Sequence, residues 1–134
     1  MSIIINDLKE FNKLAKRTLN FDKVSFRYHN KNKTGGNFAI NYKIGEWGKQ
    51  DYKNYELEGE YKTDGSFIYL RVGVAYKGIG TKINLEMINS INDLLRAFVS
   101  AIKQEEIYSE GLKWNVQNVK IGLNLLMIYV IIVL

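Results

Sequence analysis

The sequence predicts an α+β fold: an antiparallel sheet of about five or six strands with two helices packed on one face. Between residues 23 and 88, apolar and polar side chains alternate in short segments separated by glycine-containing turns, which is typical of antiparallel strands. On either side of that region, apolar residues recur every three or four positions, as in amphipathic helices. The chain has 134 residues and no proline, so residues 1–134 fit one domain without a proline-rich linker.

The first predicted helix covers residues 6–19. Asn6 or Asp7 is expected to cap its first turn, with Glu10 three residues after Asp7 as in a capping box. Lysines and Arg17 occupy the positions between the apolar ones, so the helix should have one basic face. The apolar positions are Leu8, Phe11, Leu14, Ala15 and Leu19.

Five strands should follow as a meander. The predicted segments are 23–29, 37–44, 52–61, 67–76 and 82–88. Because side chains alternate between the faces of a strand, Glu56, Glu58 and Glu60 should lie together on one face, opposite the apolar positions. The same rule places Arg27 and His29 together on the polar face of the first strand. Asp64-Gly65 is a strong hairpin-turn signal.

The second helix should begin at Ser90, with Asp93 three residues later at the capping position. An apolar stripe from Ile91 continues to about Glu106, and Gly111 should mark the point where the chain reverses. The element order is therefore helix, strand meander, helix and a last strand.

Residues 121–134 contain no charged side chain. A membrane-spanning helix needs about 20 apolar residues, so this run is too short to be a typical span. Val119, Ile121 and Leu123 alternate with polar residues and lead into a run rich in β-branched residues, which favours a final core strand. Two alternatives stay open: a segment that joins copies of the chain into an oligomer, and a short membrane anchor.

The composition limits the possible chemistry. The chain has no cysteine, which excludes disulfides, thiolate metal sites and cysteine nucleophiles. His29 is the single histidine, and no nucleophile or orienting acid can be paired with it from the sequence. No nucleophile elbow, phosphate loop or dinucleotide fingerprint is present. We therefore expect no catalytic residue, metal or cofactor, and a protein that is not an enzyme.

Charge and aromatic residues suggest two kinds of binding surface. The acidic stripe and the tryptophan in the preceding loop favour a protein partner, because tryptophan, tyrosine and arginine are enriched in protein interfaces. The other interpretation of the stripe is a solvated strand face. The predicted partner-binding residues are Trp47, Glu56, Glu58 and Glu60.

The alternative is a nucleic-acid-binding face. Residues 27–55 interleave basic and aromatic side chains, and such mixtures bind phosphates and stack on unpaired bases. Tyrosines also pack well in any sheet, which is the structural explanation of the same pattern. The candidate nucleic-acid-binding residues are Arg27, Lys31, Lys33, Lys43 and Lys49.

Segments near both ends carry a family resemblance. "IINDLKEF" near the start, and "SINDLLRAFVSAIKQ" followed by "WNVQNVKIGL", resemble the pattern of small phage-encoded anti-CRISPR inhibitors of Cas9. The resemblance implies a short opening helix, a small antiparallel sheet, and inhibition of a host defence nuclease by occupation of its nucleic-acid-binding surface. The best-known inhibitors of that kind are strongly acidic, whereas this chain carries a net charge of +5, so no binding residue is transferred from them.

The leading hypothesis is thus a non-enzymatic phage or mobile-element protein that binds a host nuclease or effector complex. Its expected location is the cytoplasm of a bacterial host cell, because the N-terminus has no basic leader segment, and membrane association is not expected. The alternatives are a nucleic-acid-binding module and an oligomeric structural phage component joined through the C-terminal segment.

Overall fold

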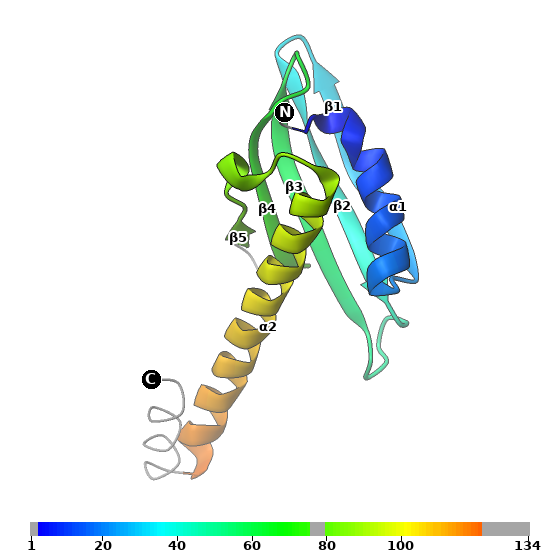
Figure 1. The fold of residues 1–134 in the computed structure, drawn as a ribbon. Helices are drawn as coiled ribbons and strands as arrows, with labels where there is room; N and C mark the ends of the chain where they lie inside the picture. The colour runs from blue at the N-terminus through cyan, green and yellow to red at the C-terminus, as the bar shows by residue number, and fades with distance from the viewer. Residues whose placement is uncertain (1–2, 76–79, 122–134) are drawn as a thin grey trace.

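The computed structural model of the protein describes residues 3–75 and 80–121, with the side chains of the last helix described as far as residue 107. The sheet has the order β1-β2-β3-β4-β5, and each strand is antiparallel to its neighbour. The predicted α+β class with an antiparallel sheet is confirmed, and the described sheet has five strands. The elements shown in Figure 1 are η1 (Ile5–Asp7), α1 (Leu8–Leu19), β1 (Lys23–Asn32), β2 (Gly35–Ile44), β3 (Lys53–Lys62), β4 (Phe67–Val74), β5 (Thr81–Lys82), η2 (Leu85–Met87) and α2 (Ile91–Ile121).

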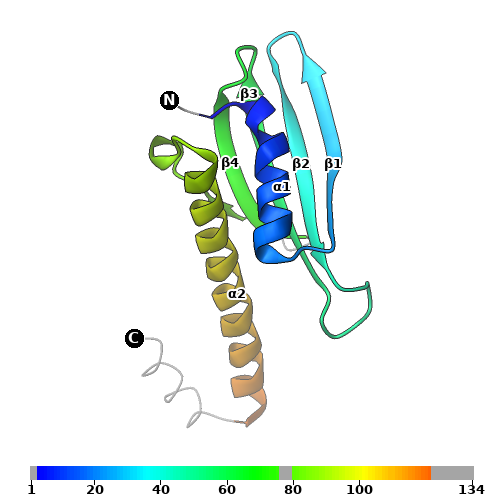
Figure 2. The same cartoon turned by 45° about the vertical axis from the view of Figure 1, so that its right-hand side comes forward.

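Helices α1 and α2 lie next to each other on the same face of the sheet (Figure 2). Phe11 of α1 and Phe98 of α2 both contact Tyr42 of β2, with ring centroids 6.2 and 4.7 Å away, and they contact each other at 5.6 Å. All three rings are fully buried, together with Leu57 of β3 and Leu70 of β4. The core therefore fills the space between this face and the two helices, and we call the opposite face of the sheet the open face.

The helix starts differ in how well the sequence predicts them. At α2 the Ser90 hydroxyl accepts a hydrogen bond from the Asp93 amide at 3.1 Å, and the Asp93 carboxylate accepts one from the Asn89 amide at 3.0 Å, as the capping pattern predicts. At α1 the Asp7 carboxylate instead accepts from the Ile4 amide at 2.8 Å. Asp7 thus caps the 3-10 turn η1, and η1 leads directly into α1.

A β-bulge in β1 changes which side chains face the helices. Phe26 pairs with Ile40, but the next pair is Tyr28 with Ala39, so Arg27 is the extra residue. The bulge moves the following residues by one position, which brings Tyr28 to the open face and His29 to the helix-covered face. The prediction that His29 shares the polar face with Arg27 is wrong, because strict alternation holds only in an uninterrupted ladder.

Two predictions for the C-terminal half are also wrong: the strand at residues 82–88 and the chain reversal at Gly111. Of the segment 82–88, only Lys82 lies in a strand, since η2 follows with the Asn84 side chain accepting from the Glu86 amide at 3.1 Å. Helix α2 continues through Gly111 to Ile121, so the chain does not reverse at Gly111, and the alternating residues Val119 and Ile121 are helical. A single glycine disfavours a helix by only about 1 kcal/mol, so it does not end one by itself. The core-strand, oligomer and anchor hypotheses for residues 122–134 concern a segment outside the described residues.

Within the described residues, no helix combines the length and the apolar content that a membrane crossing requires.

Candidate functional site

The open face of the sheet carries most of the predicted partner-binding residues. Side-chain alternation in β3 brings Glu56, Glu58 and Glu60 to this face, because Leu57 points into the core and the β2–β3 ladder is uninterrupted. None of the described helices lies on this side of the sheet (Figures 1 and 2). One row of cross-strand neighbours spans all five strands: Tyr28, Ala39, Glu58, Arg71 and Lys82.

Two of the three glutamates are paired with arginines from other strands, Glu56 with Arg27 of β1 and Glu58 with Arg71 of β4. Arg27 Nη1 lies 3.1 Å from Glu56 Oε2, and Arg71 Nη1 lies 2.9 Å from Glu58 Oε1. Glu60 is exposed and has no ion-pair partner among the residues that the structure describes. The expected acidic stripe is thus a surface on which positive and negative side chains alternate.

Two tyrosines lie beside these ion pairs. The guanidinium of Arg71 is 5.3 Å from the centre of the Tyr69 ring, and that of Arg27 is 6.0 Å from the Tyr28 ring. Burial raises the pKa of the Tyr28 hydroxyl, and the Glu58 carboxylate raises it further. Burial likewise raises the pKa of Tyr69. Both hydroxyls therefore stay protonated at neutral pH and can donate hydrogen bonds to a partner.

Trp47 lies in the loop between β2 and β3, at the end of the hairpin that extends past the sheet (Figure 1). Its side chain is 79% exposed, and its ring packs edge-on against Tyr52 at 5.5 Å. An exposed indole leaves a large apolar area in water, and such residues commonly anchor protein interfaces. The tryptophan and the glutamate-bearing strand belong to the same β2–β3 hairpin.

The candidate nucleic-acid-binding residues do not form one patch. Arg27 lies on the open face and is paired with a glutamate, whereas Lys31 lines a groove on the helix side. Lys33 lies in the turn between β1 and β2, and Lys49 lies in the β2–β3 loop at the opposite end of the sheet. Lys43 is on the open face, next to the end of β2. A single continuous strand of nucleic acid would not meet these five cations on one surface.

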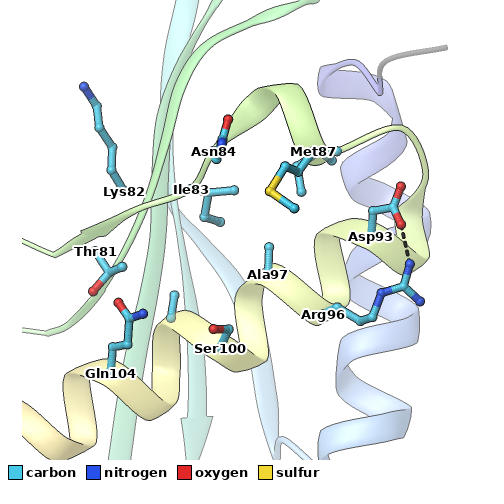
Figure 3. A pocket seen from close by; sticks show the side chains of 12 residues that line it. Thr81, Lys82, Ile83, Asn84, Met87, Asp93, Arg96, Ala97, Ser100 and Gln104 are labelled. Carbon is cyan, nitrogen blue, oxygen red and sulfur yellow. Dashed lines mark hydrogen bonds and ion pairs between the residues drawn. The ribbon is translucent and has the colours of Figure 1, made fainter.

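A groove of about 580 Å³ lies between α2 and the β5–η2 segment (Figure 3). Its one described carboxylate, Asp93, is paired with Arg96, and Figure 3 shows Thr81 and Gln104 on the side away from that pair. Met87 beside the groove is 69% exposed. General acid–base catalysis needs convergent titratable groups, and the described part of this groove offers one carboxylate that an arginine already binds.

A second groove, of about 920 Å³, lies between the first half of α1 and β1, and we call it the α1–β1 groove. Inside it, His29 stacks on Phe26 with ring centroids 5.2 Å apart, and His29 Nε2 shares a hydrogen bond of 2.7 Å with the Tyr61 hydroxyl. Burial lowers the pKa of His29, and the nearby Lys31 lowers it further, so the ring is neutral at neutral pH. Sequence reasoning missed this groove, because it depends on the bulge at Arg27.

Within the described residues, no cluster of three or more histidine, aspartate and glutamate side chains is arranged to hold a metal ion. Comparison with known proteins found no family that matches the sequence, no similar curated protein and no solved structure that matches the fold. Function is therefore argued from the chemistry of these surfaces.

Proposed function

We propose that the protein is a non-enzymatic binding module that contacts a protein partner through the open face of the sheet and Trp47. The strongest support comes from two ion pairs on the open face, Arg27–Glu56 and Arg71–Glu58. Tyrosines border both ion pairs, and none of the described helices covers them. Arginine, tyrosine and tryptophan are the residues whose truncation most often weakens protein interfaces.

The pairing also limits the chemistry of the partner. Arg71 and Glu58 are only about 30% exposed and are joined by their ion pair, which restricts both side chains before a partner binds. Ordered polar groups lose less conformational entropy on association, which favours affinity. Because positive and negative groups alternate on this face, the complementary surface should also carry both signs of charge. This arrangement fits a protein surface better than the uniform charge of a nucleic-acid backbone.

The sequence resemblance supports a narrower form of the proposal. In that form, the partner is a nuclease or effector complex of bacterial defence, and the protein inhibits it in the cytoplasm of the host cell. The open face would then occupy part of the effector's nucleic-acid-binding surface. The corresponding test is the rate of target-DNA cleavage by the purified effector with and without the protein, where an unchanged rate excludes this narrower form.

The broader proposal is tested by affinity purification from bacterial lysate with the tagged protein, with and without nuclease treatment. We expect a stoichiometric protein partner that survives nuclease, is lost with Trp47→Ala and Arg71→Glu, and is retained with Met87→Ala. Met87 is the matched control because it is exposed but lies away from the open face, beside α2. A partner that all three variants retain would place the interface elsewhere. Recovery that disappears with nuclease would favour the nucleic-acid alternative.

A further inference from the structure

We propose that the α1–β1 groove binds an acidic, extended segment of a partner protein, and that this segment pairs with the free edge of β1 as an additional strand. This site is separate from the open face, because the groove lies on the helix-covered side of the sheet. It adds a second mode of recognition to the proposed function and does not depend on it.

Strand β1 lies at one edge of the described sheet. β1 (Lys23–Asn32) is the terminal strand in the sheet order, and in the described part of the chain it pairs with β2 alone. An edge strand of ten residues presents backbone N–H and C=O groups along its outer side. Extended peptides add to such edges through main-chain hydrogen bonds, and alternate side chains then enter neighbouring pockets.

An exposed apolar side chain, Phe26, lies beside that edge and lines the α1–β1 groove. Phe26 is 46% exposed although it lies on the helix-covered face, whereas its cross-strand neighbour Ile40 is fully buried. The phenyl ring of Phe26 stacks on the imidazole of His29, and His29 shares a hydrogen bond with Tyr61. Every second side chain of an added strand would point toward this face and could cover the exposed ring. The groove is thus a preformed apolar site next to a free edge.

The described lining of the groove carries more positive than negative side chains. Lys9 and Lys13 from α1 and Lys31 from β1 line the groove, and Asp64 is the one acidic side chain among its described lining residues. This excess of positive charge favours acidic residues in the segment that binds there. It also disfavours a second copy of the chain as the occupant, because pairing two β1 edges would bring like charges together.

The experiment selects peptides from a displayed library of random 12-residue sequences against the immobilised full-length protein. We expect enriched sequences in which aspartate or glutamate alternates with apolar residues. Each selected peptide is then labelled and titrated at physiological salt, where charges more than about 8 Å apart are largely screened. Failure to enrich any sequence, or enrichment without an acidic bias, would overturn the proposal.

Charge-reversal variants locate the selected peptides on the surface. Lys9→Glu with Lys13→Glu should weaken binding about tenfold or more, since two favourable charge contacts become repulsive. The matched control is Lys16→Glu with Arg17→Glu, which makes the same charge change on α1 outside the groove lining and should change affinity about twofold or less. Equal losses for both double variants would show general electrostatic attraction in place of a site.

Backbone methylation tests the strand pairing. N-methyl groups at alternate residues of a selected peptide should abolish binding in one of the two alternation patterns and leave it nearly unchanged in the other. Equal tolerance of both patterns would contradict an added strand.

The imidazole resonances of His29 should also shift when the peptide binds. Trp47→Ala and Arg71→Glu should leave peptide affinity unchanged, because both residues lie outside this groove. Self-association of the protein that is lost when Phe26 is replaced would instead identify a second copy of the chain as the occupant.

Discussion

The hydroxyl of Tyr55 on β3 donates a hydrogen bond to the carboxylate of Glu106 on α2, and Lys53 Nζ lies 3.4 Å from the same carboxylate. In the same turn of the helix, the Thr81 hydroxyl donates to Oε1 of the neighbouring residue Glu105 at 2.8 Å. These contacts attach α2 to the sheet near the point where the helix extends past it (Figure 1). Burial raises the pKa of the Tyr55 hydroxyl well above its usual range, and the Glu106 carboxylate raises it further.

Removal of this hydroxyl should therefore destabilise the fold. We expect Tyr55→Phe to lower the free energy of unfolding by about 1–2 kcal/mol, because it deletes a hydrogen bond to a charged group. Urea denaturation at pH 7 measures the change. Tyr69→Phe is the matched control, since that hydroxyl lies on the open face, and its effect should be about 0.5 kcal/mol or less. Equal effects of the two substitutions would show that the Tyr55–Glu106 contact does not stabilise the fold.

Phe98 of α2 contacts aromatic residues of both α1 and the sheet. Its ring contacts Phe11, Phe21 and Tyr42, and all four side chains are buried. Phe98→Ala should lower the free energy of unfolding by about 3–5 kcal/mol through the lost contacts and the cavity left behind. Ile107→Ala on the same helix removes a side chain that is 70% exposed, and it should change stability by about 0.5 kcal/mol or less. Chemical denaturation of both variants checks this difference.

The Arg71–Glu58 ion pair allows stability and recognition to be separated. Arg71→Glu alone places two carboxylates together and should destabilise the fold by about 1 kcal/mol or less, since the pair is partly exposed. The double variant Glu58→Arg with Arg71→Glu restores opposite charges and should recover that stability. It should not recover binding, because the partner then meets the reversed charge pattern. A double variant that binds like the wild type would show that the pair has only a structural role.

Reversal of the whole glutamate set is the stronger test of the same surface. Substitution of Glu56, Glu58 and Glu60 by lysine should abolish binding of the protein partner found by affinity purification. Titration of the purified partner measures the loss, and circular dichroism checks that the variant is folded. Undiminished binding by a folded triple variant would mean that this strand face is solvated surface.

His29 should make stability depend on pH. Burial lowers the pKa of His29 from its usual value of 6.5, and Lys31 lowers it further. At a pH slightly below 6.5, His29 is therefore protonated more often in the unfolded chain than in the folded one. The free energy of unfolding should therefore fall as the pH is lowered from 7.5 to 5.5. His29→Gln should reduce this slope, as measured by urea denaturation at both pH values. An unchanged slope would assign the pH dependence to other groups.

The predictable parts of the fold are those where local pattern and tertiary structure agree. The ladder between β2 and β3 has no register shift, so alternation alone places the three glutamates correctly. The capping residues Ser90 and Asp93 likewise mark the start of α2. Alternation fails in β1, because the bulge at Arg27 is marked by neither glycine nor proline. The Arg27–Glu56 and Arg71–Glu58 ion pairs and the α1–β1 groove could not be derived from the sequence. They depend on the register in which β1 and β4 pair with their neighbouring strands.

The local sequence pattern also fails to predict how far α2 extends, for a related reason. Gly111 favours a chain reversal and the alternation that begins at Val119 favours a strand, yet the backbone stays helical to Ile121. The propensities of single residues for helix or strand differ by about 1 kcal/mol or less, and tertiary contacts override differences of that size. The residues in the last turns of α2 therefore do not by themselves predict a helix.

The strand order β1-β2-β3-β4-β5 is the same as the order of synthesis. Each strand can pair with its predecessor as soon as it emerges from the ribosome, and such local pairing closes only short loops, which favours rapid folding. Phe98 and Leu94, however, belong to the last described element and are made after all five strands. The apolar face of the nascent sheet therefore stays partly uncovered until α2 is translated, and this is the interval in which a chaperone would have the most surface to hold.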